Sequence, residues 1–451
     1  MKKDSLITIL IAFIVSTLIL VIFGIIVYFI YNPNSDLFGE LSKMFFKPSI
    51  SGDVSGDYSG DYSGDMLISG DEAEEEIYLG PKIFSGDSRS VAVMIDNDTS
   101  AAWPHAGLNN AYMVYEITVE GSATRLMAVF KKDNLPELIG PIRSCRHYFL
   151  DYVQEHDAIY CHFGQSTQGG EALRDRNIEH INGIVDNYYK RIKDVDKTWH
   201  NAFSTKELID KYIASKGFRD TQKQDCIIKY NQKDTNLVSN RIADKVTCRF
   251  SGIQTTSFEY DEEAKNYKVT MKNGSTERPH LEKDLNGLPD SISGDFLKNA
   301  ERYYGTIPSN LSGQKLRDYL AEKVRVYGSS EKPFVAKNIL IYRVGNESVW
   351  TAWGDHREED NKKRQELYNT GSGTGYFITN GKAIEMKWSK PSHSAKTTYT
   401  DMEGNELTFN DGTTWVEIMP LDGKITIESN TPEISSGDNS GDVSGEIRKG
   451  K

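Results

Sequence analysis

The sequence contains few cysteines, and their spacing matches no common metal-binding motif. There are 4 in 451 residues: Cys145, Cys161, Cys226 and Cys248. No CxxC pair and no Cys/His ligand spacing is present, so the sequence predicts no zinc site. Because no cysteine precedes Cys145, a lipid-modified cysteine near the N-terminus is also excluded. The thiols could form disulfides outside the cytoplasm, Cys145 with Cys161 for example, or stay free and buried.

Signatures of the common enzyme classes are absent as well. The chain has no HExxH, no GxSxG and no Walker loop. The glycine-rich stretch from Gly371 to Gly375 precedes a predicted strand rather than a helix, so a flexible turn is expected there instead of a phosphate site. The sequence therefore predicts neither a metal nor a cofactor, and it indicates no particular reaction.

Positive charge is scarce where a nucleic-acid-binding protein would need it. The formal net charge is -12, but residues 48–81 hold 9 acids and no base, which leaves residues 82–430 with a net charge of -3. A nearly neutral folded part has no electrostatic footprint for nucleic acid. Nucleic acid is therefore excluded as an expected partner.

The longest uncharged run extends from Leu6 to Tyr31. It is longer than the roughly 20 residues that cross a bilayer core, so residues 6–31 predict a tilted transmembrane helix. Lys2 and Lys3 precede it, which by the positive-inside rule leaves residues 1–5 as a cytoplasmic stub. A cleaved signal peptide is the alternative, but the run is too long and no small-residue cleavage pattern follows it. We expect a single-pass protein of the cell membrane with extracytoplasmic domains.

Two low-complexity segments flank the region that is expected to fold. The triplet Ser-Gly-Asp recurs with a period of four between Ser51 and Asp65 and returns after Ser436. Glycine and serine bury little surface and lose much entropy on ordering, so residues 32–87 predict a disordered acidic linker and residues 431–451 a disordered tail. Calcium binding by the repeated aspartates is an alternative, but the period of four and the lack of a closing glutamate argue against it.

Residues 88–225 predict an α/β domain. Buried apolar runs alternate there with stretches that have apolar residues three and four apart. The expected strands are residues 90–95, 112–119, 125–130 and 158–163, and the expected helices are residues 140–155, 171–176 and 205–216.

Residues 240–430 predict a mostly antiparallel β domain. Turn dipeptides such as Asn380-Gly381 separate short apolar runs. The expected strands are residues 267–271, 334–344, 375–378, 383–388, 397–399, 407–409, 415–420 and 425–427. Helices at residues 295–303 and 315–324 are expected within an insertion at about residues 288–331.

Polar side chains gather at the predicted strand ends and loops of the α/β domain. Ligand sites in α/β sheets form at strand ends, so we expect several of these residues to converge. The candidate ligand-binding residues are Asn97, Glu116, Glu120, Arg125, Arg143, Ser144, Arg146, His162, His200 and Asn201.

Two interpretations of the arginines remain open. Arg143 and Arg146 lie in the first turn of the helix predicted to start at residue 140, where free amides and guanidinium groups would bind an anion. Alternatively, the two arginines pair with Glu116 and Glu120 and join the helix to the sheet.

The histidines also have two interpretations. His162 and His200 could act with Glu120 in acid–base or metal chemistry. A lone histidine is, however, more often a hydrogen-bonded structural residue.

Two sets of segments carry a resemblance to known proteins. The first set is AVMIDN (92–97), VYEITVEGSATRLMAVF (114–130) and IGPIRSCRHYFLDYVQEHDAIYCHFGQS (139–166), with His200 and Asn201. The second set is YKVTMKNG (267–274), KNILIYR (337–343), GTGYFITNGKAIEMKWSK (373–390) and GTTWVEIMP (412–420), with His280 and Asp284. They resemble, respectively, the N-terminal and C-terminal domains of the YerB-like family, a bacterial group whose domains have no assigned function. The resemblance implies an architecture and an extracytoplasmic location but no reaction. Members are typically lipoproteins, whereas this chain has a predicted helix in place of a lipid-bearing cysteine.

The leading hypothesis is a membrane-tethered extracytoplasmic binding protein of the cell envelope rather than an enzyme. Its ligand is expected to be anionic, either an envelope polymer or an envelope protein. One alternative is an envelope hydrolase that uses His162 and Glu120, and another is a scaffold for other membrane proteins.

Overall fold

The structure, a computed structural model, describes residues 88–192, 200–223, 228–231, 233–286, 306–323, 326–349 and 363–429, with the single residues 294, 297 and 301. The predicted membrane helix, linker and tail, Cys226 and most of the predicted helix at residues 295–303 lie outside these ranges. Among the described residues, no helix has the length and apolar character needed to span a bilayer.

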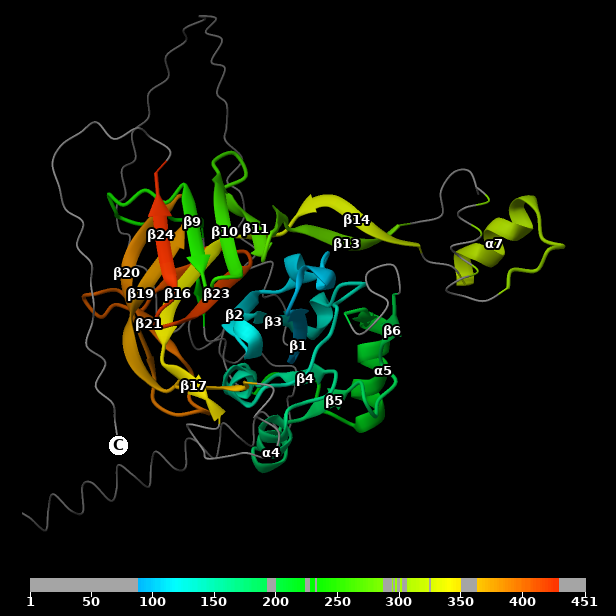
Figure 1. Cartoon of the computed structure of the whole chain (residues 1–451), viewed down its shortest axis with the longest axis horizontal. Helices are drawn as coiled ribbons and strands as arrows, with labels where there is room; N and C mark the ends of the chain where they lie inside the picture. Colours follow the sequence, from blue (N-terminus) through cyan, green and yellow to red (C-terminus); the bar gives the residue numbers. More distant parts are fainter. Residues whose placement is uncertain are drawn as a thin grey trace, which may run out of the picture. The chain divides into compact units, whose positions relative to one another are not determined.

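The largest element is a 10-stranded sheet in the order β21-β20-β19-β16-β23-β2-β3-β1-β4-β5 (Figure 1). Its N-terminal members are β1 (Ser90–Asn97), β2 (Met113–Thr118), β3 (Thr124–Lys131), β4 (Ile159–His162) and β5 (His180–Asn182). Its C-terminal members are β16 (Asn338–Val344), β19 (Gly371–Thr379), β20 (Lys382–Lys390), β21 (Thr398–Thr400) and β23 (Thr414–Pro420). Both predicted domains therefore contribute to one sheet, because β2 pairs in parallel with β23.

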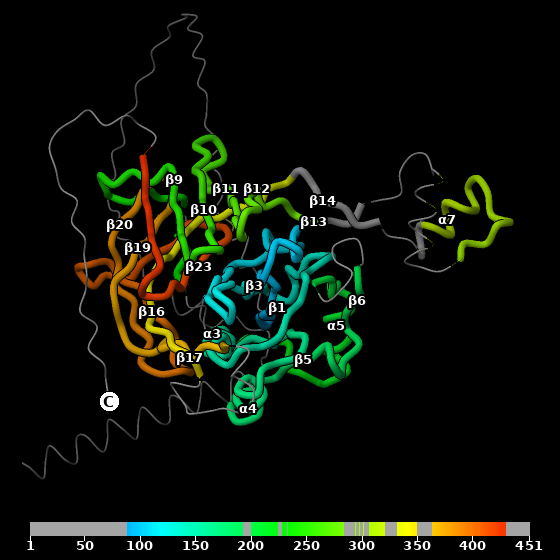
Figure 2. Tube along the Cα trace, in the orientation of Figure 1, coloured from blue at the N-terminus to red at the C-terminus, as the bar shows by residue number. Residues whose placement is uncertain are grey.

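A 6-stranded sheet has the order β12-β11-β10-β9-β24, with β15 also paired to β11. These strands are β9 (Lys245–Arg249), β10 (Gln254–Asp261), β11 (Asn266–Asn273), β12 (Thr276–Pro279), β15 (Val335–Ala336) and β24 (Lys424–Glu428). Figure 2 traces the red β24 beside the green β9, with which it pairs in antiparallel fashion. β24 thus completes a sheet whose strand β9 begins almost 180 residues earlier in the chain.

Short strand pairs and helices complete the described part. The pairs are β13 (Leu281–Asn286) with β14 (Val326–Pro333), β17 (Asn346–Ser348) with β18 (Gln365–Leu367), β22 (Thr408–Phe409) with β8 (Lys229–Tyr230) and β6 (Lys190–Arg191) with β7 (Ala202–Phe203). The α-helices are α3 (Leu150–Glu155), α4 (Thr167–Asp175), α5 (Lys206–Lys216) and α7 (Gly313–Lys323). Ser166 and Thr205 cap the N-termini of α4 and α5 through their hydroxyl oxygens.

The core lies on both faces of the 10-stranded sheet. Along β1, Val91 and Val93 belong to one buried cluster, whereas Ala92 and Met94 belong to the other. Successive side chains of a strand point to opposite faces of the sheet. A strand whose two faces are both covered therefore has a continuous apolar sequence. Trp415 of β23 packs against Phe258 of β10 with ring centroids 5.8 Å apart, so one of the two layers of the core lies between the two large sheets.

Most expected elements are present, and the prediction of a largely antiparallel C-terminal part is confirmed. The N-terminal part is a mixed sheet with few helices: β1 pairs antiparallel with β3 and parallel with β4.

The helix predicted for residues 140–155 begins later. A 3-10 turn at His147–Phe149 leads into α3, and the preceding residues are extended. The reason is that their backbone groups bond to β1, with Asp96 N to Pro141 O at 2.8 Å and Arg143 N to Met94 O at 2.9 Å.

The flexible turn predicted between Gly371 and Gly375 is wrong, because these residues open β19. A Cβ at Gly375 would lie 2.1 Å from the backbone oxygen of Ile341, and one at Gly373 would lie 2.8 Å from Nε1 of Trp388. The glycines therefore allow β19 to approach its neighbours closely.

Three of the four cysteines are described. Cys145, Cys161 and Cys248 are free and buried, so the disulfide considered between Cys145 and Cys161 is not formed.

Candidate functional site

Asp96 connects three segments where β1 leaves the sheet. Its buried carboxylate Oδ2 lies 2.7 Å from Nδ1 of His200 and 3.3 Å from Nε of Arg143. Its backbone oxygen lies 2.6 Å from Nε2 of His105. Asp96 therefore links the segment of Arg143, the loop of His200 and the loop after β1.

Three guanidinium groups converge beside it on Asp98 and Glu120. Arg125, buried in β3, donates to both carboxylate oxygens of Asp98 at 3.0 and 3.1 Å and to Glu120 at 3.2 Å. Arg143 donates to Asp98 at 3.0 Å, and Nε of Arg146 donates to Glu120 at 2.9 Å. Charge-assisted and bidentate pairs of this kind are stronger than neutral hydrogen bonds. Each guanidinium group of the cluster thus has a carboxylate partner.

This network is closed rather than poised for an anion. Burial would raise the pKa values of Asp98 and Glu120, but the adjacent arginines outweigh it and hold both below their usual range. The helix N-terminus predicted beside Arg143 is absent because α3 begins only at Leu150. Of the predicted alternative pairings, the one between Arg146 and Glu120 is present.

Two further predicted residues support this region through neutral groups. The backbone oxygen of Ser144 accepts a hydrogen bond from Nη1 of Arg125 at 2.6 Å. The side-chain oxygen of Asn201 accepts one from Nη1 of Arg191 at 2.8 Å. Ser144 therefore helps to hold the arginine network, whereas Asn201 holds the segment around β6.

Asn97 and Glu116 belong to a different, inaccessible cluster. The carboxyl of Glu116 accepts hydrogen bonds from Thr124 Oγ1 at 2.6 Å and Thr256 Oγ1 at 2.7 Å, and Asn97 donates to Thr124 at 2.9 Å. Burial raises the pKa of Glu116 to about 7, even though these hydrogen bonds act in the opposite direction. The cluster ties β1 and β2 to β10 and is closed to ligand.

His162 is also separate from Glu120. Its Nδ1 lies 2.7 Å from the backbone oxygen of Gly164, and its Nε2 lies 2.9 Å from Nδ1 of His180. Burial lowers the pKa of His162 to about 3. Within the described ranges, no three His, Cys, Asp or Glu side chains are placed to hold a metal ion. The two members of the predicted acid–base pair therefore have different partners.

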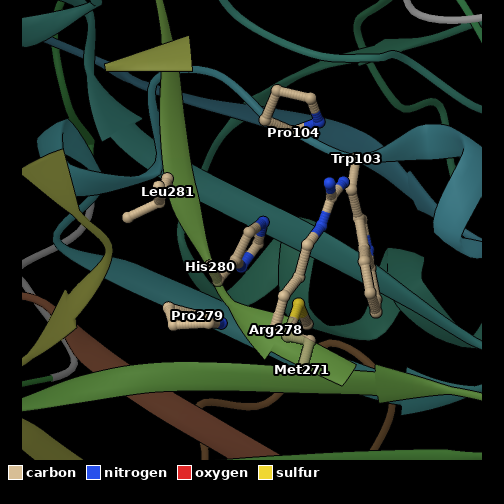
Figure 3. A pocket seen from close by; sticks show the side chains of 7 residues that line it. All are labelled: Trp103, Pro104, Met271, Arg278, Pro279, His280 and Leu281. Atoms are coloured by element: carbon tan, nitrogen blue, oxygen red, sulfur yellow. The ribbon is translucent and has the colours of Figure 1, made fainter. Parts of the chain in front are cut away.

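A small pocket beside the loop that follows β1 was not predicted from the sequence. It has a volume of about 50 Å³ and is drawn in Figure 3, where the side chain of Arg278 runs alongside the indole of Trp103. The loop after β1 supplies Trp103 and Pro104, and the edge of the 6-stranded sheet supplies most of the rest. The lining residues are Trp103, Pro104, Met271, Arg278, Pro279, His280 and Leu281.

The histidines at this pocket have unused hydrogen-bonding groups. His280 is 3% exposed, and neither ring nitrogen has a hydrogen-bond partner in the described part of the chain. The ring of His105 lies against it, with centroids 4.6 Å apart, and Nδ1 of His105 likewise lacks a partner there. Burial lowers the pKa of His105 to about 3 and that of His280 well below its usual range. Both rings are therefore neutral, and each has one donor and one acceptor.

Arg278 supplies the charge at the pocket. Its guanidinium carbon lies 5.5 Å from the centre of the Trp103 ring, and the side chain is exposed. Trp103 in turn donates from Nε1 to Asn97 at 2.9 Å, which fixes the ring. No carboxylate of the described residues pairs with Arg278, in contrast to Arg125, Arg143 and Arg146. The pocket thus combines an unpaired cation with an unsatisfied imidazole.

Sequence reasoning missed this pocket because its walls come from segments far apart in the chain. One signal was available: Trp103-Pro104-His105 and Arg278-Pro279-His280 are two tripeptides with histidine after proline. Neither tripeptide matches a catalytic motif, and only the fold brings them together.

Comparisons with known proteins agree with this architecture. Residues 82–219 match the family model described as "Protein of unknown function (DUF3048) N-terminal domain", and residues 313–416 match the corresponding C-terminal domain. A curated relative, "Putative lipoprotein YerB" of Bacillus subtilis (strain 168), is 23% identical over 335 residues, which cover 74% of this chain and 82% of the relative.

A solved structure shares the fold. The crystal structure of the YerB protein from Bacillus subtilis aligns with a TM-score of 0.53 and 21% identity, over 75% of this chain and 94% of that one. The likeness supports the arrangement of strands described above and assigns no role to the pocket.

Proposed function

We propose that this chain, which belongs to the YerB-like family of DUF3048 proteins, is a membrane-anchored extracytoplasmic protein that binds an anionic group of a cell-envelope ligand. The proposed site is the pocket between Trp103 and His280. The observation that carries the proposal is that the guanidinium of Arg278 and the buried imidazole of His280 lie together at this pocket and that, among the residues the structure describes, the first has no carboxylate partner and the second no hydrogen-bond partner.

Anchoring is supported by the sequence and by the relative. The uncharged run from Leu6 to Tyr31 is long enough to span a bilayer. The relative is named as a lipoprotein, so a similar location would be reached there through a lipid. A helix and a lipid differ in chemistry but both hold a folded part at the membrane surface.

The chemistry of the pocket favours an anion. A guanidinium group binds carboxylate or phosphate through two parallel N–H bonds, and a neutral imidazole adds a further N–H donor. Burying an imidazole without hydrogen bonds costs about 1–3 kcal/mol, which a ligand that supplies the missing acceptor would recover. The wall of Trp103 and Met271 excludes water from one side and strengthens these bonds.

The volume of the pocket limits the size of the chemical group that it can bind. A water molecule needs roughly 10–15 Å³ of such a cavity, whereas sites for whole small molecules measure roughly 300–1,000 Å³. A pocket of about 50 Å³ therefore accepts one small group of a larger ligand. A carboxylate or phosphate carried by an envelope polymer has that size, with the rest of the polymer on the outer surface.

The test is a binding titration of the full-length protein in detergent with two polymers, poly-L-glutamate and poly(glycerol phosphate). The wild type is expected to bind at least one of them, and Arg278→Gln is expected to weaken binding about tenfold or more. Arg241→Gln is the matched control, because Arg241 also lies over an aromatic ring, Tyr376 at 4.6 Å, and neither of these residues lines the pocket. Equal affinity of all three proteins, or no binding by the wild type, would refute the proposed site.

A further inference from the structure

A second, larger cavity lies away from the Trp103 pocket. Its volume is about 410 Å³, within the range of small-molecule sites. It is bounded by the end of α3, the start of β4, the end of α4 and the segments around Arg219 and Ser394. The lining residues are Arg89, Val153, Gln154, Asp157, Ala158, Arg176, Asn177, Ile178, Glu179, Arg219, Lys223 and Ser394.

Cations outnumber carboxylates in this lining, with four against two. Asp157 binds two of the arginines. Its Oδ1 accepts a hydrogen bond from Nη2 of Arg219 at 2.6 Å, and its backbone oxygen accepts one from Nε of Arg89 at 2.6 Å. Arg89 also pairs with Glu179. These contacts fix both arginines in place at the cavity.

Lys223 is the lining cation that has no carboxylate partner among the described residues. Its backbone N–H donates to Oδ2 of Asp157 at 2.8 Å, which places the residue at the cavity. Its side chain is exposed, and no carboxylate of the described residues pairs with the ammonium group. Lys223 is therefore held by its backbone while its charge stays available.

A histidine and a buried aspartate lie beside the lining residue Arg176. Oδ2 of Asp151 lies 2.9 Å from Nδ1 of His393, and Oδ1 accepts from Nη1 of Arg176 at 2.6 Å. Asn369 holds the same carboxylate at 3.2 Å. His393 precedes the lining residue Ser394 and is 56% exposed in its side chain, so Nε2 remains free to contact a ligand while Asp151 orients the ring.

We propose that this cavity binds a phosphate group through Lys223, Arg176 and His393. Rigid guanidinium donors, a mobile ammonium group and an oriented imidazole together suit an anion with several oxygens and more than one charge. A single carboxylate would leave most of these donors unused. The volume accommodates a phosphate with an organic substituent or a second phosphate.

The proposal is independent of the Trp103 pocket, since no residue lines both. The experiment is titration calorimetry of the full-length protein in detergent with inorganic pyrophosphate and with glycerophosphoglycerol. Pyrophosphate represents a free terminal phosphate and glycerophosphoglycerol a phosphodiester, and binding of either supports the site. Lys223→Gln and His393→Gln are each expected to weaken binding about fivefold or more.

Lys245→Gln serves as the control, because Lys245 is an exposed lysine paired with Glu259 on the 6-stranded sheet. It is expected to bind as the wild type does. Thermal unfolding of each variant verifies that the fold is retained, which is expected because both residues are exposed. Absence of binding by the wild type to both compounds, or equal affinity of the Lys223, His393 and Lys245 variants, would overturn the proposal.

Discussion

Glu116 of β2 and Glu417 of β23 lie directly opposite each other in neighbouring parallel strands, where the N-terminal and C-terminal parts of the 10-stranded sheet meet. Both are fully buried. Glu116 has hydroxyl donors, whereas neither carboxyl oxygen of Glu417 has a hydrogen-bond partner among the described residues. Two carboxylates cannot both be charged in such a place, so the seam of the sheet carries bound protons.

The pair makes stability depend on pH. Burial raises the pKa of Glu417 well above its usual value, with the nearby Glu116 adding to the effect, and raises that of Glu116 to about 7. A carboxyl with a raised pKa in the folded state contributes its full stability below its unfolded pKa and loses it as the pH rises through the folded value. For Glu116, a rise from 4.5 to about 7 corresponds to roughly 3 kcal/mol, lost between about pH 4.5 and 7.

Glu417→Gln is therefore expected to stabilise the protein at pH 8 and to have little effect at pH 5, because the amide is neutral at both. The measurement is urea unfolding followed by tryptophan fluorescence at the two pH values. Glu385→Gln, an exposed residue of β20, is the control and should leave the pH dependence unchanged. A Glu417→Gln variant that is less stable than the wild type at pH 8 would show that the carboxylate has a partner.

The arginine network is predicted to be structural. Arg146→Ala removes a buried partner of Glu120 and leaves that carboxylate with Arg125 alone, so we expect a loss of about 3 kcal/mol in the free energy of unfolding. Chemical unfolding of the variant measures this directly. Arg174→Ala, which breaks an exposed pair with Asp175, should cost less than about 1 kcal/mol. Similar losses for both variants would contradict a closed network at Glu120.

The three described cysteines are predicted to be unreactive. Burial raises the pKa of Cys145 to about 12 and raises that of Cys248 well above its usual value, so little thiolate forms at neutral pH. Iodoacetamide labelling followed by mass spectrometry should find Cys145, Cys161 and Cys248 unmodified in the native protein and modified after denaturation. Labelling of Cys145 under native conditions would indicate that the segment around it opens.

His393 is predicted to carry a proton at a higher pH than a free histidine. The hydrogen bond that Nδ1 of His393 donates to the Asp151 carboxylate raises the pKa of His393. Partial burial and the nearby Arg176 oppose this rise, and Glu366 adds to it. Titration by NMR of the wild type and of Asp151→Asn should show a lower pKa in the variant. An unchanged pKa would mean that the pair does not form in solution.

Local sequence patterns were sufficient to predict the strands but not to predict how the strands pair in sheets. The apolar runs around Val91 and Val114 and the turn dipeptides placed most elements correctly, because burial on both faces leaves an obvious signal. Met113 pairs with Thr414, about 300 residues away in the chain, and a contact over this distance leaves no local pattern in the sequence. The shared sheet could therefore not be predicted from the sequence.

The candidate site was predictable only in part, because its contacts also join segments that lie far apart in the chain. Residues near one another in sequence, such as Arg143 and Arg146, were correctly grouped, but which charges neutralise which depends on the fold. The helix start was placed too early because the extended segment after Pro141 takes its hydrogen bonds from β1, a contact that periodicity cannot reveal. His280 joins Trp103 only through tertiary packing.

The central claim is that the Trp103 pocket binds an anion through Arg278 and His280. The most direct measurement is ¹⁵N NMR of the histidine rings in the full-length protein during titration with the polymer that binds. The account predicts that the resonances of the His280 ring nitrogens shift on binding in the wild type, and that Arg278→Gln needs about tenfold or more polymer for the same shift. Binding that leaves the His280 resonances unchanged would contradict it.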